Sequence, residues 1–150
     1  MKVTGGCHCG AIKYQAQVNE QKVMICHCTD CQVLSGSAFR TIVISEADGL
    51  SFTHGQPKEY IKVAESGNKR AQGFCGDCGS ALYATSVTKE VNGDEANGDE
   101  TNDGEPKIYG IRLGTVDQKA VLTPNAQIWC RSASSWLGNM ADIKSFSTVP

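Results

Sequence analysis

Short stretches in which apolar and polar residues alternate run along the chain and are separated by glycine-rich turns. Residues 11–18 (AIKYQAQV) alternate in part, as a strand with one buried face does. Residues 22–25 predict a second short strand, and residues 38–44, which are β-branched and apolar, predict a core strand. Further strands are expected at residues 57–63, 70–74, 81–87, 107–113 and 127–131. Many short strands with little helix predict an all-β fold class.

One short helix is predicted at residues 29–37. Thr29 and Asp30 are residue types that cap the start of a helix, and Gly36 can adopt the left-handed conformation that ends one. This helix would begin within a cluster of cysteines.

Residues 92–106 read NGDEA NGDET NDGEP, an imperfect tandem repeat of five residues that is polar and acidic. Such a composition offers little to bury, so we expect a disordered surface insertion at residues 89–107. Its spacing does not match the twelve-residue EF-hand loop, which argues against calcium binding. The insertion interrupts what we expect to be a single domain spanning residues 1–150.

Length and charge exclude several classes of partner. No apolar run approaches the roughly 20 residues of a membrane-spanning helix, and residues 1–10 lack the apolar stretch of a signal peptide. A cytoplasmic location without membrane contact is therefore expected. The net charge is −2, but residues 89–107 carry seven of the sixteen acids and two of the fourteen bases, so 12 bases and 9 acids remain elsewhere. This mildly basic remainder has no dense Lys/Arg block, which argues against a nucleic-acid partner.

Eight cysteines dominate the candidate chemistry. They are Cys7, Cys9, Cys26, Cys28, Cys31, Cys75, Cys78 and Cys130. C-x-C and C-x-x-C spacings place thiols side by side, which suits one metal ion better than disulfide partners across a fold. A reducing cytosol also disfavours disulfides. The pattern therefore predicts zinc bound by thiolates.

Two of the cysteine pairs complement each other. On an extended backbone Cys7 and Cys9 project to the same side, but a structural zinc takes four ligands at about 2.3 Å from sulfur. Cys75 and Cys78, followed by Gly79, form a zinc-knuckle sequence that supplies the other two thiolates. We expect a closed four-cysteine zinc site joining segments separated by 65 residues.

The second cluster, Cys26, Cys28 and Cys31, lies within six residues and can fill three corners of a tetrahedron. A fourth ligand from the chain would make the site structural, whereas water or substrate there would make it open and catalytic. The candidates for a fourth ligand are Cys130, His27, His8, His54 and Asp30.

These candidates are not equivalent. Cys130 lies in the apolar sequence QIWCRS without a neighbouring cysteine or knuckle glycine, and we expect it in the core. His8 and His27 each lie between two cysteines of a C-x-C pair, so an extended backbone points them away from the thiols. His54 is expected in a turn.

These motifs resemble the glutathione-dependent formaldehyde-activating enzyme (GFA) family, also called the CENP-V/GFA domain. The segments that carry the resemblance are GGCHCGAIKY, CHCTDCQVLSGSAF, FCGDCGSALY, IRLGTVD and QIWCRSASSWL, within residues 5–137. The resemblance implies an Mss4-like fold, a small β domain built around zinc. It also implies that Cys7, Cys9, Cys75 and Cys78 hold a structural zinc and that Cys26, Cys28 and Cys31 hold a catalytic one.

The activity implied by the resemblance joins glutathione and formaldehyde to give S-hydroxymethylglutathione, and is classed as that of a carbon–sulfur lyase. This chain departs from the family pattern in its acidic insertion and in Cys130. The expected partners are therefore a small thiol such as glutathione and a small aldehyde such as formaldehyde.

The chemistry of an open three-thiolate site fits such partners. Three thiolates leave zinc with a net charge of −1 and weaken it as a Lewis acid, so a soft thiol is a better fourth ligand than water. A thiolate can attack an aldehyde carbon, and His27, Asp30 or Ser35 are candidate proton donors. The alternatives are a non-catalytic module with two structural zinc sites and, with the least support, a nucleic-acid zinc ribbon.

Overall fold

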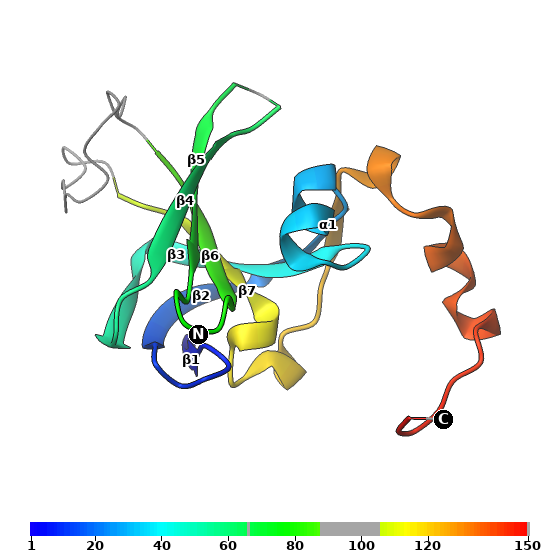
Figure 1. Cartoon of the computed structure of the whole chain (residues 1–150), viewed down its shortest axis with the longest axis horizontal. Coiled ribbons are helices and arrows are strands. Elements are labelled where there is room, and N and C mark those ends of the chain that lie inside the picture. Colours follow the sequence, from blue (N-terminus) through cyan, green and yellow to red (C-terminus); the bar gives the residue numbers. More distant parts are fainter. Residues whose placement is uncertain (66, 88–105, 150) are drawn as a thin grey trace.

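One mostly antiparallel sheet runs through the part of the chain described by the computed structural model, residues 1–65, 67–87 and 106–149 (Figure 1). Its strand order is β1-β2-β3-β7-β6-β5-β4, and β8 pairs with β2 in parallel. The strands are β1 (Lys2–Gly6), β2 (Lys13–Cys26), β3 (Arg40–His54), β4 (Lys58–Val63), β5 (Lys69–Phe74), β6 (Ala81–Ser86), β7 (Tyr109–Arg112) and β8 (Ala126–Ile128). The all-β fold class predicted from the sequence is confirmed.

The helical elements are short, and α1 (Thr29–Ser35) carries part of the second cysteine cluster. The predicted helix at residues 29–37 is confirmed, and Gly36 ends it in the left-handed conformation at φ 62°. The 3₁₀ turns are η1 (Leu113–Thr115), η2 (Lys119–Val121), η3 (Cys130–Ser132) and η4 (Ser135–Asp142).

Two of the predicted strands, residues 11–18 and 22–25, are one continuous strand, β2, so the predicted break between them was wrong. Val18 and Val23 are both fully buried against β3, and the intervening polar residues are accommodated by irregular register between them. β3 likewise continues well beyond the predicted residues 38–44. β1 was not predicted, because its sequence KVTGG has a single large apolar residue.

The core is formed mainly by side chains of the strands. Its largest fully buried side chains are Leu82, Ile111, Val3, Val18, Val23, Val43 and Val116. Aromatic rings pack beside them, with Tyr83 in edge contact with Tyr109 at 5.3 Å between ring centroids. A Cβ on Gly73 would collide with the Tyr83 ring, so glycine is required for β5 to pass under that ring.

The chain ends on the α1 side of the sheet. Beyond β8 the ribbon passes through η3 and η4 and extends away from the strands (Figure 1). Trp136, Met140 and Ile143 on this segment are exposed. Within the described ranges no helix is both long and apolar enough to cross a membrane. The acidic insertion predicted at 89–107 lies outside the described residues except for 106 and 107.

Candidate metal centres

The first cysteine cluster is built from two tight turns. In one, between β1 and β2, the Cys7 N–H donates to the Ile12 carbonyl at 3.0 Å and Gly10 takes a φ of 81°. In the other, between β5 and β6, the Gly79 N–H donates to the Cys75 carbonyl at 2.9 Å and Gly79 has a φ of 73°. Both turns need a left-handed residue, and glycine adopts that conformation without a Cβ clash.

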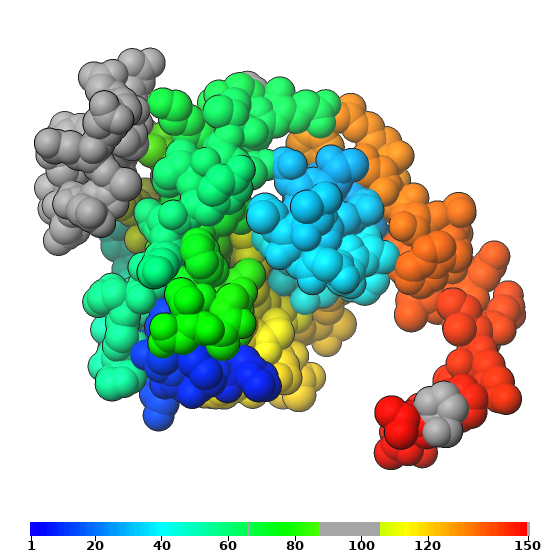
Figure 2. All heavy atoms as spheres, in the orientation of Figure 1, coloured from blue at the N-terminus to red at the C-terminus, as the bar shows by residue number. Residues whose placement is uncertain are grey.

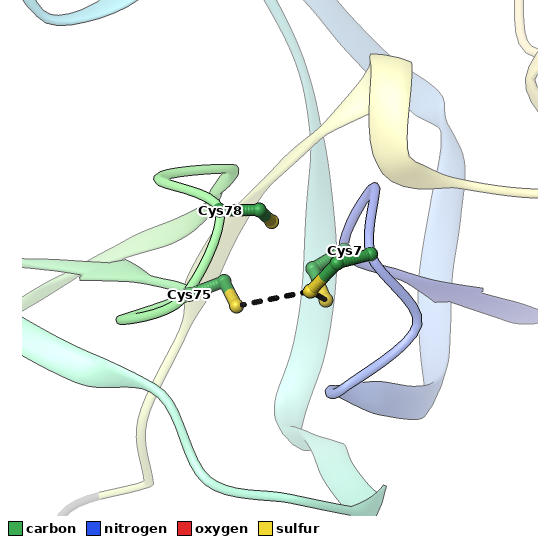
Figure 3. Close-up of side chains that lie close together, drawn as sticks. Cys7, Cys75 and Cys78 are labelled. Atoms are coloured by element: carbon green, nitrogen blue, oxygen red, sulfur yellow. Dashed lines mark hydrogen bonds between the residues drawn. The ribbon is translucent and has the colours of Figure 1, made fainter.

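The four thiols of this cluster converge. Cys75 and Cys78 face Cys7 across the gap between the turns (Figure 3), and all four sulfur atoms of the cluster, with Cys9, lie within 4.8 Å of one another. The Cys7–Cys9 and Cys9–Cys75 sulfur separations are 3.5 and 3.8 Å. Zinc–sulfur bonds of about 2.3 Å put the corners of a tetrahedron about 3.8 Å apart. The donor set and its spacing therefore fit a tetrahedral four-thiolate ion.

Polar groups around these sulfurs suit thiolates. The Ile12 N–H donates to the Cys7 sulfur at 3.2 Å, and the Ser80 hydroxyl lies 3.2 Å from the Cys78 sulfur. Hydrogen bonds from Ser80 lower the pKa of the Cys78 thiol to about 5. Such donors offset the negative charge that four thiolates would leave on a zinc ion.

The second cluster is built locally, where β2 runs into α1. Cys26 is the last residue of β2, Cys28 is the N-cap of α1, and Cys31 lies in its first turn. The Cys31 N–H donates to the Cys28 sulfur at 3.3 Å, and the Cys26 and Cys28 sulfurs are 3.5 Å apart. The three sulfurs lie within 4.8 Å of one another, and no further Cys, His, Asp or Glu of the described residues joins them.

Hydrogen bonding within this cluster shifts the pKa values of Cys26 and Cys31 in opposite directions. A hydrogen bond from Cys31 lowers the pKa of the Cys26 thiol to about 5, while the same contact raises the pKa of Cys31. A thiol that gives up its proton this readily suits a soft metal ion. Three sulfurs at these separations could hold one ion and leave one corner of its tetrahedron open.

The three histidines lie outside both groups of sulfurs. His8 and His54 are exposed. His27 is buried, but its Nε2 atom lies 2.8 Å from the Gln127 amide oxygen and its ring is in edge contact with Phe39. The expectation that His8 and His27 point away from the thiols agrees with these positions.

Two candidate proton donors have other partners. Asp30 forms an ion pair with Lys62, which ties α1 to β4. The Ser35 hydroxyl donates to the Cys31 carbonyl at 2.7 Å. Neither is left free to serve the cluster in this arrangement.

Cys130 is exposed, so the expectation that it is a core residue was wrong. The predicted strand at residues 127–131 ends at Ile128, and Trp129 then takes a φ of 59°, which turns the chain into η3. The residues after β8 are therefore not held against the sheet, and Cys130 does not gather with the other thiols.

Two buried arginines beside the second cluster were missed in the sequence. Arg40 pairs with Cys26 in the β2–β3 ladder, and Arg112 lies on β7 opposite Ile42 of β3. Burial and, to a smaller extent, the neighbouring Arg40 lower the pKa of the Arg112 guanidinium to about 9. The signal in the sequence was a single arginine inside an apolar strand, in AFRTIVIS and in YGIRLG.

A pocket of about 240 Å³ opens between α1 and strands β4 to β6. Leu34 lines it from α1, Tyr60 from β4 and Arg40 from the start of β3. In Figure 2 the cyan atoms of α1 stand against the green atoms of these strands. The pocket therefore adjoins the helix that carries Cys28 and Cys31.

The chain is similar to known proteins in sequence and in fold. The family model described as glutathione-dependent formaldehyde-activating enzyme matches residues 2–132. An uncharacterized lyase of Schizosaccharomyces pombe is 29% identical over 79 residues, which are 53% of this chain and 54% of that protein. The chain thus matches about half the length of this curated relative. A crystal structure of a Rhodobacter sphaeroides protein has a similar fold, with a TM-score of 0.53, 14% identity and coverage of 83% of this chain and 98% of the other.

Proposed function

The chain belongs to the glutathione-dependent formaldehyde-activating enzyme family, and from that premise we propose that it is a zinc-dependent enzyme of the carbon–sulfur lyase type. It joins a small thiol to a small aldehyde, or cleaves the adduct, at Cys26, Cys28 and Cys31. The observation that carries the proposal is the incomplete cluster: three sulfurs lie within 4.8 Å, and no fourth ligand comes from the described residues. An open corner is what a catalytic zinc site has and a structural one lacks.

The first cluster is proposed as the structural site. Cys7, Cys9, Cys75 and Cys78 offer a complete tetrahedral donor set, and they join two turns that are far apart in sequence. With one ion in each cluster, the protein would carry two zinc ions per chain.

The proposed reaction forms one carbon–sulfur bond. A zinc ion at the second cluster would supply a soft Lewis acid that lowers the pKa of a coordinated thiol. The sulfur attacks the aldehyde carbon, the carbon–oxygen π bond breaks, and the thiol proton ends on the aldehyde oxygen. The product is a thiohemiacetal, and the reverse reaction cleaves the same bond. Cys26, Cys28 and Cys31 would hold the ion, and this would place the attacking sulfur.

The substrates are proposed from the family. Its name indicates glutathione and formaldehyde, and the yeast relative is named a lyase. The cytoplasm is the proposed location, because all eight cysteines are free thiols and a reducing compartment keeps them so.

One observation favours a second candidate, a zinc module with two closed structural sites. β8 pairs in parallel with the end of β2, so that Ile128 lies opposite Cys26 of the second cluster. Cys130 comes only two residues after Ile128. A rearrangement of η3 could bring that thiol to the open corner. The protein would then have no position for a substrate thiol.

Cobalt substitution tests the proposal. Cobalt occupies tetrahedral thiolate sites, and its visible spectrum reports on the ligands. Glutathione should change the spectrum of one site and leave that of the four-cysteine site unchanged, and the zinc protein should consume formaldehyde with glutathione. An unchanged cobalt spectrum at saturating glutathione would reject the enzyme and favour the closed module. A spectral change without formaldehyde turnover would keep the thiol site and reject the substrate.

A further inference from the structure

Two guanidinium groups are buried beside the second cluster without a carboxylate partner. Arg40 is 6% exposed and Arg112 is 7% exposed. Neither forms an ion pair with a carboxylate of the described residues, and Arg40 Nη2 and Arg112 Nε have no hydrogen-bond partner. A buried charge is costly unless it is paired, so these groups need negative charge beside them, from the thiolates of the second cluster and from a bound anion.

Arg40 also lines the pocket between α1 and the strands. Gln72 lines it as well, and its amide oxygen accepts a 2.6 Å hydrogen bond from Arg112 Nη2. That bond fixes the orientation of the amide and leaves its nitrogen to donate. The pocket thus combines a guanidinium and an amide donor with walls from Leu34, Phe74 and Tyr83, which suit a ligand with an apolar body and one anionic end.

The pocket is close to the cluster. Arg40 pairs with Cys26 in the strand ladder, and Leu34 lies three residues after Cys31, so both are on one face of α1. A ligand in the pocket therefore has the sulfur cluster within reach of a short chain.

A charge count separates two explanations for the arginines. Three thiolates on a zinc ion have a net charge of −1, whereas Arg40 and Arg112 together contribute +2. If the arginines served the thiolates alone, one positive charge would remain buried. A substrate thiolate at the open corner would supply the missing charge. The planar guanidinium fork of Arg40, which lines the pocket and whose Nη2 has no partner, matches a carboxylate as well.

We infer that this pocket binds the carboxylate of the substrate thiol, with Arg40 as the anion-binding residue and Gln72 as a second donor. The inference rests on the proposed function, because it needs a thiol at the second cluster. It narrows the substrate to thiols whose carboxylate can reach Arg40 while their sulfur lies at the second cluster.

The test compares two thiols of the same length on the wild-type protein: mercaptopropionate, which is anionic, and mercaptopropanol, which is neutral. Calorimetric titration of the zinc protein gives their affinities, and the cobalt spectrum shows whether each thiol reaches the metal. Mercaptopropionate should bind at least roughly tenfold tighter, since hydrogen bonds to a charged group contribute that much or more. Equal affinities, with both thiols changing the spectrum, would overturn the inference and leave the proposed function intact. No spectral change with either thiol would overturn the inference, and the proposed function would fall with it if glutathione also left the spectrum unchanged.

Variants then assign the preference to Arg40. Arg40→Gln should make the affinities for mercaptopropionate and mercaptopropanol nearly equal. Arg40→Lys should keep part of the preference for mercaptopropionate, because lysine keeps the positive charge. Arg131→Gln is the matched control, because Arg131 is exposed and pairs with Glu65. Zinc content and thermal melting of each variant check that the cluster and fold persist. If Arg40→Gln retains zinc and the full preference for mercaptopropionate, Arg40 is not the anion-binding residue.

Discussion

The two cysteine clusters use the same ligand atoms and differ in how they depend on the fold. Cys7 and Cys9 are separated from Cys75 and Cys78 by 65 residues, and their four sulfurs meet only because β1–β2 and β5–β6 place two turns together. Cys26, Cys28 and Cys31 lie within six residues at one strand–helix junction. A metal in the first cluster therefore closes a long loop, whereas a metal in the second needs mainly α1 to be in place.

The surroundings of the clusters differ as well. Backbone N–H groups and the Ser80 hydroxyl surround the first, and its four sulfurs complete a tetrahedral donor set. The second has three sulfurs, two buried arginines and a pocket beside it. The neighbours of the cysteines, more than the cysteines themselves, support the proposal that the first cluster is structural and the second binds substrate.

The largest expected effect comes from Cys75→Ser. Structural zinc binding contributes about 10–16 kcal/mol to folding in small zinc domains, and Cys75 is 1% exposed at the centre of the first cluster. The variant should unfold or lose most of its thermal stability, as measured by circular dichroism melting together with zinc analysis. A variant that melts at the wild-type temperature with two zinc ions bound would contradict the structural role of this cluster.

Cys28→Ser should affect function more than fold. Serine is a good N-cap, so it can replace the Cys28 sulfur in accepting the Cys31 N–H and keep α1 intact. The variant should lose about one zinc per chain and all thiol–aldehyde turnover, while its melting curve remains cooperative. Metal analysis and an assay with glutathione and formaldehyde measure both effects. Unfolding of this variant to the extent expected for Cys75→Ser would remove the distinction between the clusters.

A matched glycine pair tests the same distinction with a smaller change. Gly36 ends α1 at φ 62° and Gly79 ends the knuckle at φ 73°, and no atom lies within 4 Å of an added Cβ at either position. Each change to alanine should cost about 1 kcal/mol of backbone strain and little else. Gly36→Ala should weaken zinc at the second cluster and Gly79→Ala at the first, as measured by chelator titration of each protein. Equal weakening of both ions by either variant would mean that the clusters are coupled.

The sequence predicted most strands and the grouping of the cysteines, for different reasons. The sequence located β4, β5 and β6 to within one residue, because each is a short strand bounded by a turn or by the Cys75–Cys78 knuckle. The grouping of Cys7 and Cys9 with Cys75 and Cys78 was predicted because a structural zinc ion needs four ligands. The pattern of apolar and polar residues carries no information about this grouping. β2 was divided in two because its polar middle resembles a turn, although Val18 and Val23 are packed against the same partner strand.

What escaped prediction depends on tertiary contacts. Arg40 and Arg112 are buried beside the cysteines only through the pairing of β3 with β2 and β7, and nothing in the local sequence says which strands meet. Cys130 was placed in the core because its neighbours are apolar, but the turn at Trp129 leads the chain off the sheet. The single-domain organisation, the Mss4-like label and the disorder of the acidic insertion stay predictions.

The smallest effect is expected from Cys130→Ser. This variant tests whether the second cluster lacks a fourth protein ligand. Cys130 is exposed and lies apart from the three gathered sulfurs, so its loss should change the free energy of unfolding by no more than about 0.5 kcal/mol. Zinc content, glutathione turnover and the cobalt response to thiol should all remain at wild-type values, and Cys130 should react with a thiol-specific reagent without loss of metal. If Cys130→Ser instead releases the ion of the second cluster, this thiol is the fourth ligand, brought in by movement of η3. The two clusters would then both be closed four-cysteine sites, and the remaining asymmetry between them would be the length of chain that each one joins.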